Sequence, residues 1–474
     1  MRISPLNLHN ISYKNSSILS ANVKSSDVKT NFDYVPVFYG ALLSNSLKAG
    51  DKQKIENLID DYAVDNPNIK LLGKGTCGTA YKIDFPNKTP FVVKVLSDDA
   101  VTNYGGGNLK KEAEILRQIP NECKRTQQLI DYFETDKRAY LVSSLIKGEP
   151  LSKLKTLNKS QLNNITDELF KYDRYGLMFY DLNPNNIFVD GDNVGFIDFE
   201  FVENKLPKCY NLESLNDAHH ISRNLYFPQK SNINSFENRS LGGILLGLNE
   251  NQGNKLVKDY LKSLSKYHFK MSEFLGNGSA KISPKAIEYE KTLAKLFEEP
   301  SEEIVEIEKN LIELRYITLN YHLYLHRKNA GKLLAGDEEM YGDFDKYIEK
   351  MQHKTLKTLQ KIEEFSNKND DKDIKNYCKV NRIFVENFIR KNANKSYYEL
   401  RKNINVTQNL DFDVRNIISN FDNYNQNDLE KILAAFYVKS NRIKERYRES
   451  ETINEFCNNM EYVLENTTSF LNEI

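Results

Sequence analysis

Three side chains that can bind a metal ion or activate a hydroxyl group lie close together in the sequence: Asp181, Asn186 and Asp198. Carboxylate and amide oxygens suit Mg²⁺, which takes few protein ligands and keeps water and phosphate oxygens for the rest. A carboxylate at position 181 could instead accept the proton of a substrate hydroxyl group. The residues predict metal-assisted chemistry at a hydroxyl group. A solvated hairpin whose Asp and Asn side chains only form turns is the alternative.

Two short apolar runs, residues 187–189 and 194–197, lie between these polar side chains and are separated by Asp-Gly-Asp-Asn at 190–193. Strand-type residues on both sides of such a turn predict a β-hairpin. The hairpin would bring Asp181, Asn186 and Asp198 close together in space.

Lys94 lies in an apolar stretch, residues 90–96, that predicts a β-strand. On an alternating strand it shares a face with Val92 and Leu96, and a lysine in such surroundings usually has a partner for its charge. A lysine that reaches solvent from an edge strand is the alternative.

A glycine-rich segment precedes this strand and consists of Gly73, Lys74, Gly75, Thr76, Cys77 and Gly78. Glycine lets backbone amide groups approach phosphate oxygens without a Cβ in the way. The same pattern occurs in dinucleotide-binding folds, but a helix follows it there. Here residues 80–83 have strand character, so we expect a strand, a phosphate-binding loop and a second strand.

The order of these features over residues 69–200 resembles the protein kinase-like superfamily, with features of both eukaryotic-like Ser/Thr protein kinases and aminoglycoside phosphotransferase-type kinases. The resemblance implies ATP and Mg²⁺. It implies that Asp181 is the catalytic base, that Asn186 and Asp198 hold the metal, and that Lys94 holds the α- and β-phosphates. The ATP-binding residues that it implies are Gly73, Lys74, Gly75, Thr76, Cys77, Gly78, Lys94, Glu112, Ser144, Leu145 and Ile146.

The helix glutamate and the hinge follow from the same resemblance. Glu112, in the helix predicted over residues 108–119, takes the place of the glutamate that pairs with the lysine, and Glu114 is the competing choice. Ser143 takes the gatekeeper position, and residues 144–146 would offer backbone groups to adenine.

The sequence departs from the family pattern around the catalytic residues. Phe179 and Tyr180 replace His-Arg before Asp181, and Asn183 replaces a lysine, which removes a positive charge near the transferred phosphate. Glu200 stands where Asp-Phe-Gly has its glycine. The changes at 183 and 200 favour a small-molecule kinase of the aminoglycoside phosphotransferase type.

A helix resembling the D-x-W-S-x-G helix of protein kinases follows at residues 236–248, with Glu237 at the Asp position and Arg239 at the Trp position. Together with the three glycines, it favours a protein Ser/Thr kinase that transfers the γ-phosphate of ATP to a hydroxyl group. A nucleotide-binding pseudokinase scaffold and AMP transfer are further alternatives.

The elements that must position these residues can be predicted from local patterns. Helical spacing of apolar residues at 52–63 and 161–175 predicts helices, and residues 127–133 and 139–146 predict two strands around a turn. The fold class expected is therefore α+β. It would be a bilobal protein kinase-like fold, with a small antiparallel β-lobe containing one main helix and a mainly helical large lobe, followed by an all-helical C-terminal module.

Domain boundaries are expected at residues 1–50 for a flexible leader, 51–320 for the kinase-like domain and 321–474 for the helical module. The small lobe would take residues 65–147 and the large lobe 148–320. Asn427 is expected to cap a helix through residue 437. The helical module is predicted to be a platform that binds a partner protein or a substrate.

The composition bears on three further questions: nucleic-acid binding, membrane insertion and the cellular compartment. The 474 residues hold 66 Lys+Arg and 66 Asp+Glu, so no net field favours nucleic acid, and no long apolar run predicts a membrane span. Five scattered cysteines without a C-x-x-C pair predict reduced thiols in a cytoplasmic environment. The Ser- and Asn-rich leader is similar to those of bacterial effectors exported into host cells without a cleaved signal peptide; a plain disordered terminus is the alternative.

Overall fold

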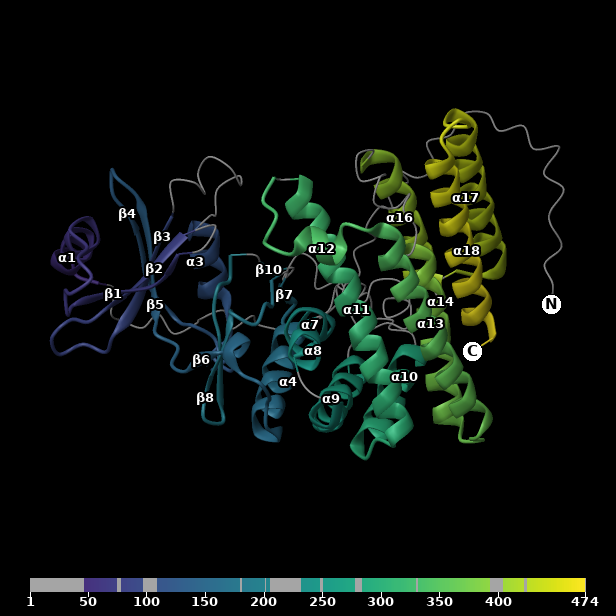
Figure 1. Ribbon diagram of the computed structural model, residues 1–474, viewed down its shortest axis with the longest axis horizontal. Coiled ribbons are helices and arrows are strands. Elements are labelled where there is room, and N and C mark those ends of the chain that lie inside the picture. Colours follow the sequence, from purple (N-terminus) through teal and green to yellow (C-terminus); the bar gives the residue numbers. More distant parts are fainter. Residues whose placement is uncertain are drawn as a thin grey trace. The chain divides into compact units, whose positions relative to one another are not determined.

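A computed structural model describes residues 47–74, 78–96, 109–179, 181–200, 202–204, 232–247, 250–277, 284–329, 331–392, 404–421 and 424–473 (Figure 1). The strands are β1 (Ile69–Lys74), β2 (Gly78–Ile83), β3 (Phe91–Leu96), β4 (Leu129–Glu134), β5 (Ala139–Ser144), β6 (Glu149–Pro150), β7 (Leu177–Phe179), β8 (Ile187–Asp190), β9 (Asn193–Phe196) and β10 (Val202–Asn204). The first helices are α1 (Ala49–Asp60), α3 (Leu109–Gln118), the 3₁₀ turn η2 (Leu151–Lys153) and α4 (Lys159–Arg174).

Helices make up the rest of the described chain. They are α7 (Asn232–Phe236), the π-helical turn η3 (Glu237–Leu241), α8 (Gly242–Leu246), α9 (Glu250–Gly276), α10 (Pro284–Glu298), α11 (Glu302–Asn329), α12 (Asp337–Tyr341), α13 (Phe344–Asn367), α14 (Lys372–Asn392), α16 (Ile404–Ser419), α17 (Gln426–Arg446) and α18 (Glu451–Glu473). The expected sequence of a β-rich part followed by a helical part is therefore present.

A five-stranded antiparallel sheet, in the order β1-β2-β3-β5-β4, forms the small lobe. In β3 the side chains alternate, so that Phe91, Val93 and Val95 are buried in a cluster with residues of α1 while Lys94 points to the other face. Because side chains of a strand alternate between its two faces, the core residues and the lysine are separated without any break in the strand.

Helix α3 packs on the sheet against β3, β4 and β5. Its buried residues Leu109, Ala113 and Leu116 recur at helical spacing, and Glu112 lies on that same buried side while Glu114 is exposed. The packing of the apolar face thus decides which glutamate points toward the sheet.

The predicted hairpin is present as β8 and β9, with Ile187 paired to Phe196 and Asp190 to Asn193. It is joined at its edge by β6. A two-stranded ladder of β7 and β10 was not predicted, because strands of three residues are too short to show an alternating pattern.

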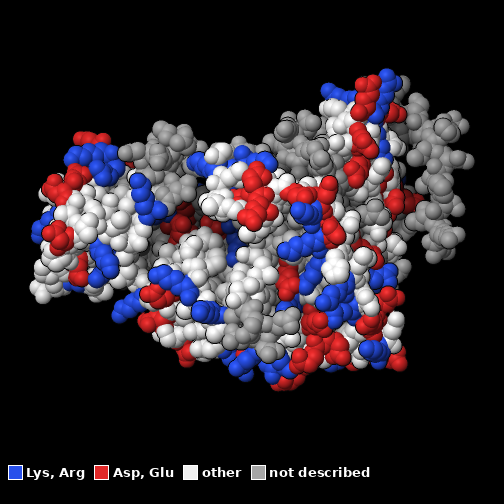
Figure 2. Space-filling model, in the orientation of Figure 1, with Lys and Arg blue, Asp and Glu red and all other residues white. Residues whose placement is uncertain are grey.

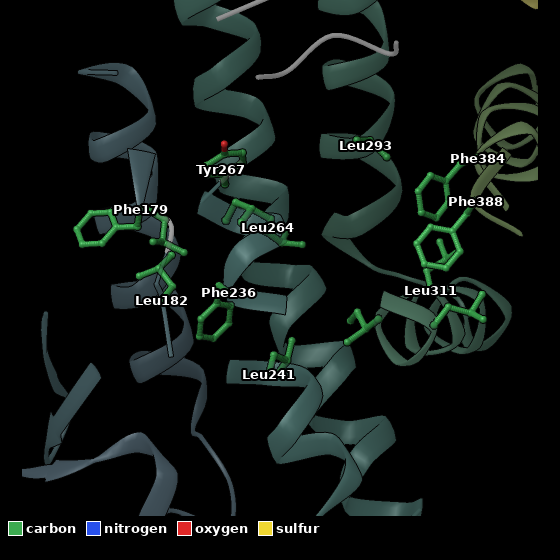
Figure 3. Packing of buried hydrophobic residues seen from close by; sticks show 14 of the residues in the cluster. Phe179, Leu182, Phe236, Leu241, Leu264, Tyr267, Leu293, Leu311, Phe384 and Phe388 are labelled. Carbon is green, nitrogen blue, oxygen red and sulfur yellow. The ribbon is translucent and has the colours of Figure 1, made fainter. Parts of the chain in front are cut away.

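Buried side chains from the loop around the hairpin and from the helices that follow form one hydrophobic cluster (Figure 3). Phe179 and Leu182, on either side of Asp181, belong to this cluster together with Phe236 and Leu241 of the α7–η3 segment. Burial of these flanking residues fixes the backbone on which Asp181 is carried.

The helical C-terminal part packs through α11, which contacts η3, α8 and α9 on one side and α13 on the other. Residue 320, the predicted boundary, lies inside α11, and the domain boundaries stay a prediction. The predicted helix cap was two residues late: Asn425 caps α17 by accepting a hydrogen bond from the amide of Asp428.

Lys and Arg side chains are interspersed with Asp and Glu side chains over the described surface that Figure 2 shows. No helix among the described residues is long and apolar enough to cross a membrane. Cys123, Cys378 and Cys457 are buried free thiols, whereas Cys77, Cys209 and most of the predicted leader lie outside the described residues.

Candidate active site

The side chain of Lys94 ends among three carboxylates. Its Nζ lies 3.0 Å from Glu112 Oε2, 2.6 Å from Asp198 Oδ1 and 3.3 Å from Glu200 Oε2. The partners come from α3 and from the loop after β9, so one ammonium group joins the small lobe to the large lobe. Three donors face three acceptors, which satisfies the hydrogen-bonding capacity of the lysine.

Glu112 is completely buried and has a partner for each carboxylate oxygen. Oε2 accepts from Lys94, and Oε1 accepts from Gln127 Nε2 and from the backbone amide of Phe199, both at 3.1 Å. A buried carboxylate needs such compensation. The structure therefore brings Glu112 to Lys94 and leaves Glu114 at the surface.

The charge state of Lys94 follows from two opposed effects. Burial would lower its pKa, but the neighbouring carboxylates, Glu112 first and then Asp198, hold the pKa well above the ordinary value. The Lys94 side chain is therefore held in its charged form.

Asp181 follows β7, and both of its carboxylate oxygens are engaged. Oδ1 lies 2.7 Å from Arg239 Nη1, and Oδ2 accepts a hydrogen bond of 3.0 Å from Asn183 Nδ2. Burial raises the pKa of Asp181, and the charge of Asp198 adds to the rise, while Arg239 and Asn183 oppose it. A carboxylate with a raised pKa that stays hydrogen-bonded is suited to accept a proton.

Asn186 and Asp198 are the predicted metal ligands. The Asn186 Nδ2 group donates to the backbone carbonyl of Asp181 at 3.1 Å, which leaves the amide oxygen as its ligand atom. Asp198 has a left-handed backbone, with φ 65°, a strained conformation that is found where a side chain must point in one direction.

The carboxylates around Asp198 suit a divalent cation. Oxygens of Glu112, Asp198 and Glu200 lie within 4.8 Å of one another, the one such cluster among the described residues. Lys94 Nζ contacts all three carboxylates, and only Asp198 among them is substantially exposed, so a divalent cation would bind at Asp198. The Asp198 carboxylate and the Asn186 amide oxygen are donors of the kind that Mg²⁺ prefers, so these two residues fit the ion. Asp198 and Asn186 would hold it, with Glu200 as a nearby acidic group.

The glycine-rich segment forms the end of β1 and the start of β2. A Cβ at Gly73 would meet nothing within 4 Å, whereas a Cβ at Gly78 would lie 2.7 Å from the Val95 carbonyl oxygen and 3.4 Å from Lys94 Cε. Gly78 thus has to be small because β2 passes close to the backbone of β3 at Val95. Lys74 is exposed and pairs with Thr79, and Gly75, Thr76 and Cys77 lie outside the described residues.

The hinge begins where β5 ends. The Ser144 amide donates to the Gln128 carbonyl, and Ser144 Oγ accepts from the Gln128 amide, both at 2.8 Å. The amides of Leu145 and Ile146 have no partner among the described residues, which leaves them available to a nucleotide base. Ile146 also packs so closely on Gly195 of β9 that a Cβ there would lie 2.3 Å from Ile146 Cγ2.

Buried polar contacts hold the loop that carries Asp181. Asn232 of α7 accepts from the Phe179 amide at 2.9 Å, and its Nδ2 group donates to Asp173 Oδ1 and to the Leu177 carbonyl. Ser240 Oγ donates to the Leu182 carbonyl at 2.7 Å. The backbone is thus tied to α7 and η3 immediately before and after Asp181.

Sequence reasoning did not foresee the contacts of Arg239 and Glu200 with the site. From the sequence, Arg239 was assigned only to the position that tryptophan takes in the D-x-W-S-x-G helix. Glu200 was noted only because the family has glycine at that position. The sequence did contain a signal that points to Arg239. Asn183 leaves the loop without the lysine that is expected there, and Arg239 is the one basic residue between positions 232 and 247. Tyr180, Phe201 and residues 205–231 lie outside the described residues.

Comparison with known proteins agrees with this geometry. Residues 67–215 match the family described as protein kinase domain. The chain is also similar to a serine/threonine-protein kinase D from Synechocystis sp., with 26% identity over 160 residues, which is 31% of each chain. It thus matches about a third of the length of that relative. The predicted fold class, bilobal and protein kinase-like with a helical C-terminal part, is confirmed.

Proposed function

We propose that this protein is an ATP- and Mg²⁺-dependent protein Ser/Thr kinase. The observation that carries the proposal is the position of Lys94, which pairs at once with Glu112 of α3 and with Asp198. A lysine held by both lobes is suited to fix the phosphates of a nucleotide relative to Asp181.

In the proposed reaction an acceptor hydroxyl oxygen bonds to the γ-phosphorus of ATP. The bond from that phosphorus to the β–γ bridging oxygen breaks, and its electron pair leaves with ADP. The hydroxyl proton passes to Asp181, whose carboxylate is held in position by Arg239 and Asn183. Lys94 orients the α- and β-phosphates, and the backbone around Gly78 gives close access to them.

Bound Mg²⁺ would neutralise phosphate charge, and Asp198 and Asn186 would hold it. The exposure of Asp198, about a third of its side chain, is consistent with a ligand that has to meet both the ion and the nucleotide. The amides of Leu145 and Ile146 would receive the adenine ring.

The protein acceptor is supported by the similarity to a Ser/Thr kinase over part of the chain. Asn183 and Glu200 are the observations that favour a small-molecule acceptor instead. The partner-binding role of the C-terminal helices and a cytoplasmic or exported location stay proposals.

Transfer from γ-labelled ATP tests the proposal. The purified protein would be incubated with Mg²⁺ and a general protein acceptor, beside an Asp181→Asn variant. We expect label on protein Ser or Thr that is lost in the variant. Label on small hydroxyl compounds alone would favour a small-molecule kinase.

Two further results would contradict phosphoryl transfer. Label from α-labelled but not γ-labelled ATP on the acceptor would indicate AMP transfer. Mg²⁺-dependent nucleotide binding without any transfer, under conditions in which the protein is folded, would indicate a pseudokinase scaffold.

A further inference from the structure

Arg239 is a cation at the catalytic aspartate that comes from outside the catalytic loop. It lies in η3, 58 residues after Asp181, and its Nη1 donates to Asp181 Oδ1 at 2.7 Å. The loop itself has Asn183 where a lysine is expected, so the positive charge beside Asp181 comes from another element.

The guanidinium group is held in place by its own element. The next residue, Ser240, donates to the Leu182 carbonyl from a fully buried position, and Glu237, two residues earlier, is paired with the buried Arg315. The π-helical turn between these anchors departs from regular helix geometry, as such turns often do at functional sites. Arg239 therefore has a fixed base and a side chain that remains about a quarter exposed.

The hydrogen-bonding capacity of Arg239 exceeds what Asp181 uses. A guanidinium group has five N–H donors in one plane, and the described residues give one of its nitrogens a partner. The remaining donors suit phosphate oxygens, which arginine binds in a planar, two-point manner. Because Arg239 contacts Asp181 through one nitrogen and keeps further donors, it can contact the catalytic base and the transferred phosphoryl group at the same time.

We propose that Arg239 is a catalytic residue that replaces the missing loop lysine: one nitrogen orients Asp181 while the other donors bind oxygens of the γ-phosphoryl group in transit. This inference rests on the proposed kinase function and adds a residue to it. As the acceptor oxygen bonds to phosphorus and the bond to ADP breaks, the phosphoryl oxygens keep their negative charge and meet a fixed cation. The hydroxyl proton still goes to Asp181.

The test compares three variants in the full chain. Arg239→Gln removes the charge. Asn183→Lys in the Arg239→Gln background restores a cation beside Asp181 from the loop. Arg382→Gln is the matched control, because Arg382 is an exposed arginine of α14 that pairs with Glu386 in its own helix.

We expect Arg239→Gln to lower kcat by about 10²–10³-fold, the usual loss on removing one donor to a transition state. Its affinity for Mg²⁺ and ATP should stay within about threefold of the wild type, since the contact forms with the group in transit. The double variant should regain at least about tenfold in kcat. Arg382→Gln should match the wild type.

Rescue by a loop lysine separates a catalytic role from a structural one. A lysine at position 183 supplies a positive charge beside Asp181 but does not restore the side chain that η3 has lost. A merely structural arginine would not be replaced by that lysine, and its loss would not lower kcat while the affinity for Mg²⁺ and ATP is kept.

Several results would overturn the inference. Unchanged kcat in Arg239→Gln would remove Arg239 from catalysis, and increased kcat would indicate that it blocks Asp181. A loss without recovery in the double variant, or a loss of affinity for Mg²⁺ and ATP as large as the loss of kcat, would leave a structural role. If the wild type transfers no label at all, the proposed kinase function fails, and the inference fails with it.

Discussion

Two groups of buried charges in this protein differ in how they are balanced. In the first group, which we name the Lys94 cluster, one cation, Lys94, meets three acids, Glu112, Asp198 and Glu200, a formal charge of 1 − 3 = −2. At the junction of the large lobe with the C-terminal helices, Arg315 meets Glu237 and lies near Glu308, a formal charge of 1 − 2 = −1.

The second group, which we name the junction network, finds the partners for its polar groups within the protein. Its members are Glu237, Glu308, Arg315 and Tyr377: Arg315 donates to Glu237, and the Tyr377 hydroxyl donates to Glu308 at 2.7 Å. Burial, together with the charge of Glu237, raises the pKa of Glu308 to about 7, so that protonation can bring this group to neutrality.

The Lys94 cluster differs in that a ligand can reach one of its acids. Burial raises the pKa of Glu112, as it does that of Glu308, but Asp198 is about one-third exposed, and Lys94 is the single cation that the described residues place among the three acids. An excess of carboxylates costs free energy until a cation or a proton binds. The comparison therefore distinguishes a buried network from a cluster that offers one accessible carboxylate to a ligand.

Replacing Lys94 should give the largest effect. Lys94→Met removes the cation of the Lys94 cluster, so we expect phosphoryl transfer to fall by roughly 10³-fold or more, because phosphate positioning and charge neutralisation are lost together. Transfer of γ-label measures it, and circular dichroism checks the fold. The control is Lys153→Met, which changes an exposed lysine paired with Glu149. Equal turnover in Lys94→Met and the control would exclude the Lys94 cluster as the nucleotide site.

Replacing Arg315 should affect stability more than activity. Arg315→Met leaves Glu237 buried without its cation, which typically destabilises a protein by about 3–5 kcal/mol. Urea unfolding measures the loss. Turnover per folded molecule should fall far less than in Lys94→Met, because Arg315 acts on Arg239 only through the Glu237 anchor of η3. The double variant with Glu237→Gln should recover part of the stability. If Arg315→Met kept its stability but lost its activity, the junction network would serve activity and not folding.

Removing one carboxylate from the Lys94 cluster should weaken metal binding. Asp198→Asn keeps a residue type that tolerates the left-handed backbone, which Ala would strain. We expect Mg²⁺ affinity in the presence of ATP to fall by at least about 10–100-fold, the loss that even outer-shell changes cause at metal sites. Calorimetry with and without Mg²⁺ tests this, and an unchanged Mg²⁺ requirement would exclude Asp198 as a ligand.

The smallest effect concerns pH. Between the ordinary pKa of 4.5 and about 7, the folded protein keeps a proton on Glu308 that the unfolded chain releases, so the free energy of unfolding falls as pH rises through this window. Glu308→Gln removes this contribution and should be more stable than the wild type at pH 8 by on the order of 1–3 kcal/mol. Urea unfolding at pH 5 and pH 8 measures the difference. A pH-independent difference between the two proteins would contradict the raised pKa.

Much of the fold could be predicted because it follows from patterns among residues that are close together in the sequence. The hairpin of β8 and β9 follows from two apolar runs around a turn, and the face of Lys94 follows from alternation along β3. Helix α3 follows from apolar spacing. The ladder of β7 and β10 and the Asn425 cap were missed, because short strands and neighbouring Asn residues give no distinct local signal.

The sequence by itself determined which residue types were available: an acid at 181, an amide at 186, an acid at 198 and a lysine on a strand, in an order that resembles kinases. It also determined that the loop lacks a lysine at 183. Tertiary structure decided which charges meet. Glu112 was selected over Glu114 by helix packing, and Arg239 reached Asp181 across 58 residues because η3 packs on the catalytic loop. Ion pairs between distant segments depend on how whole elements pack, and spacing along the chain does not encode that packing.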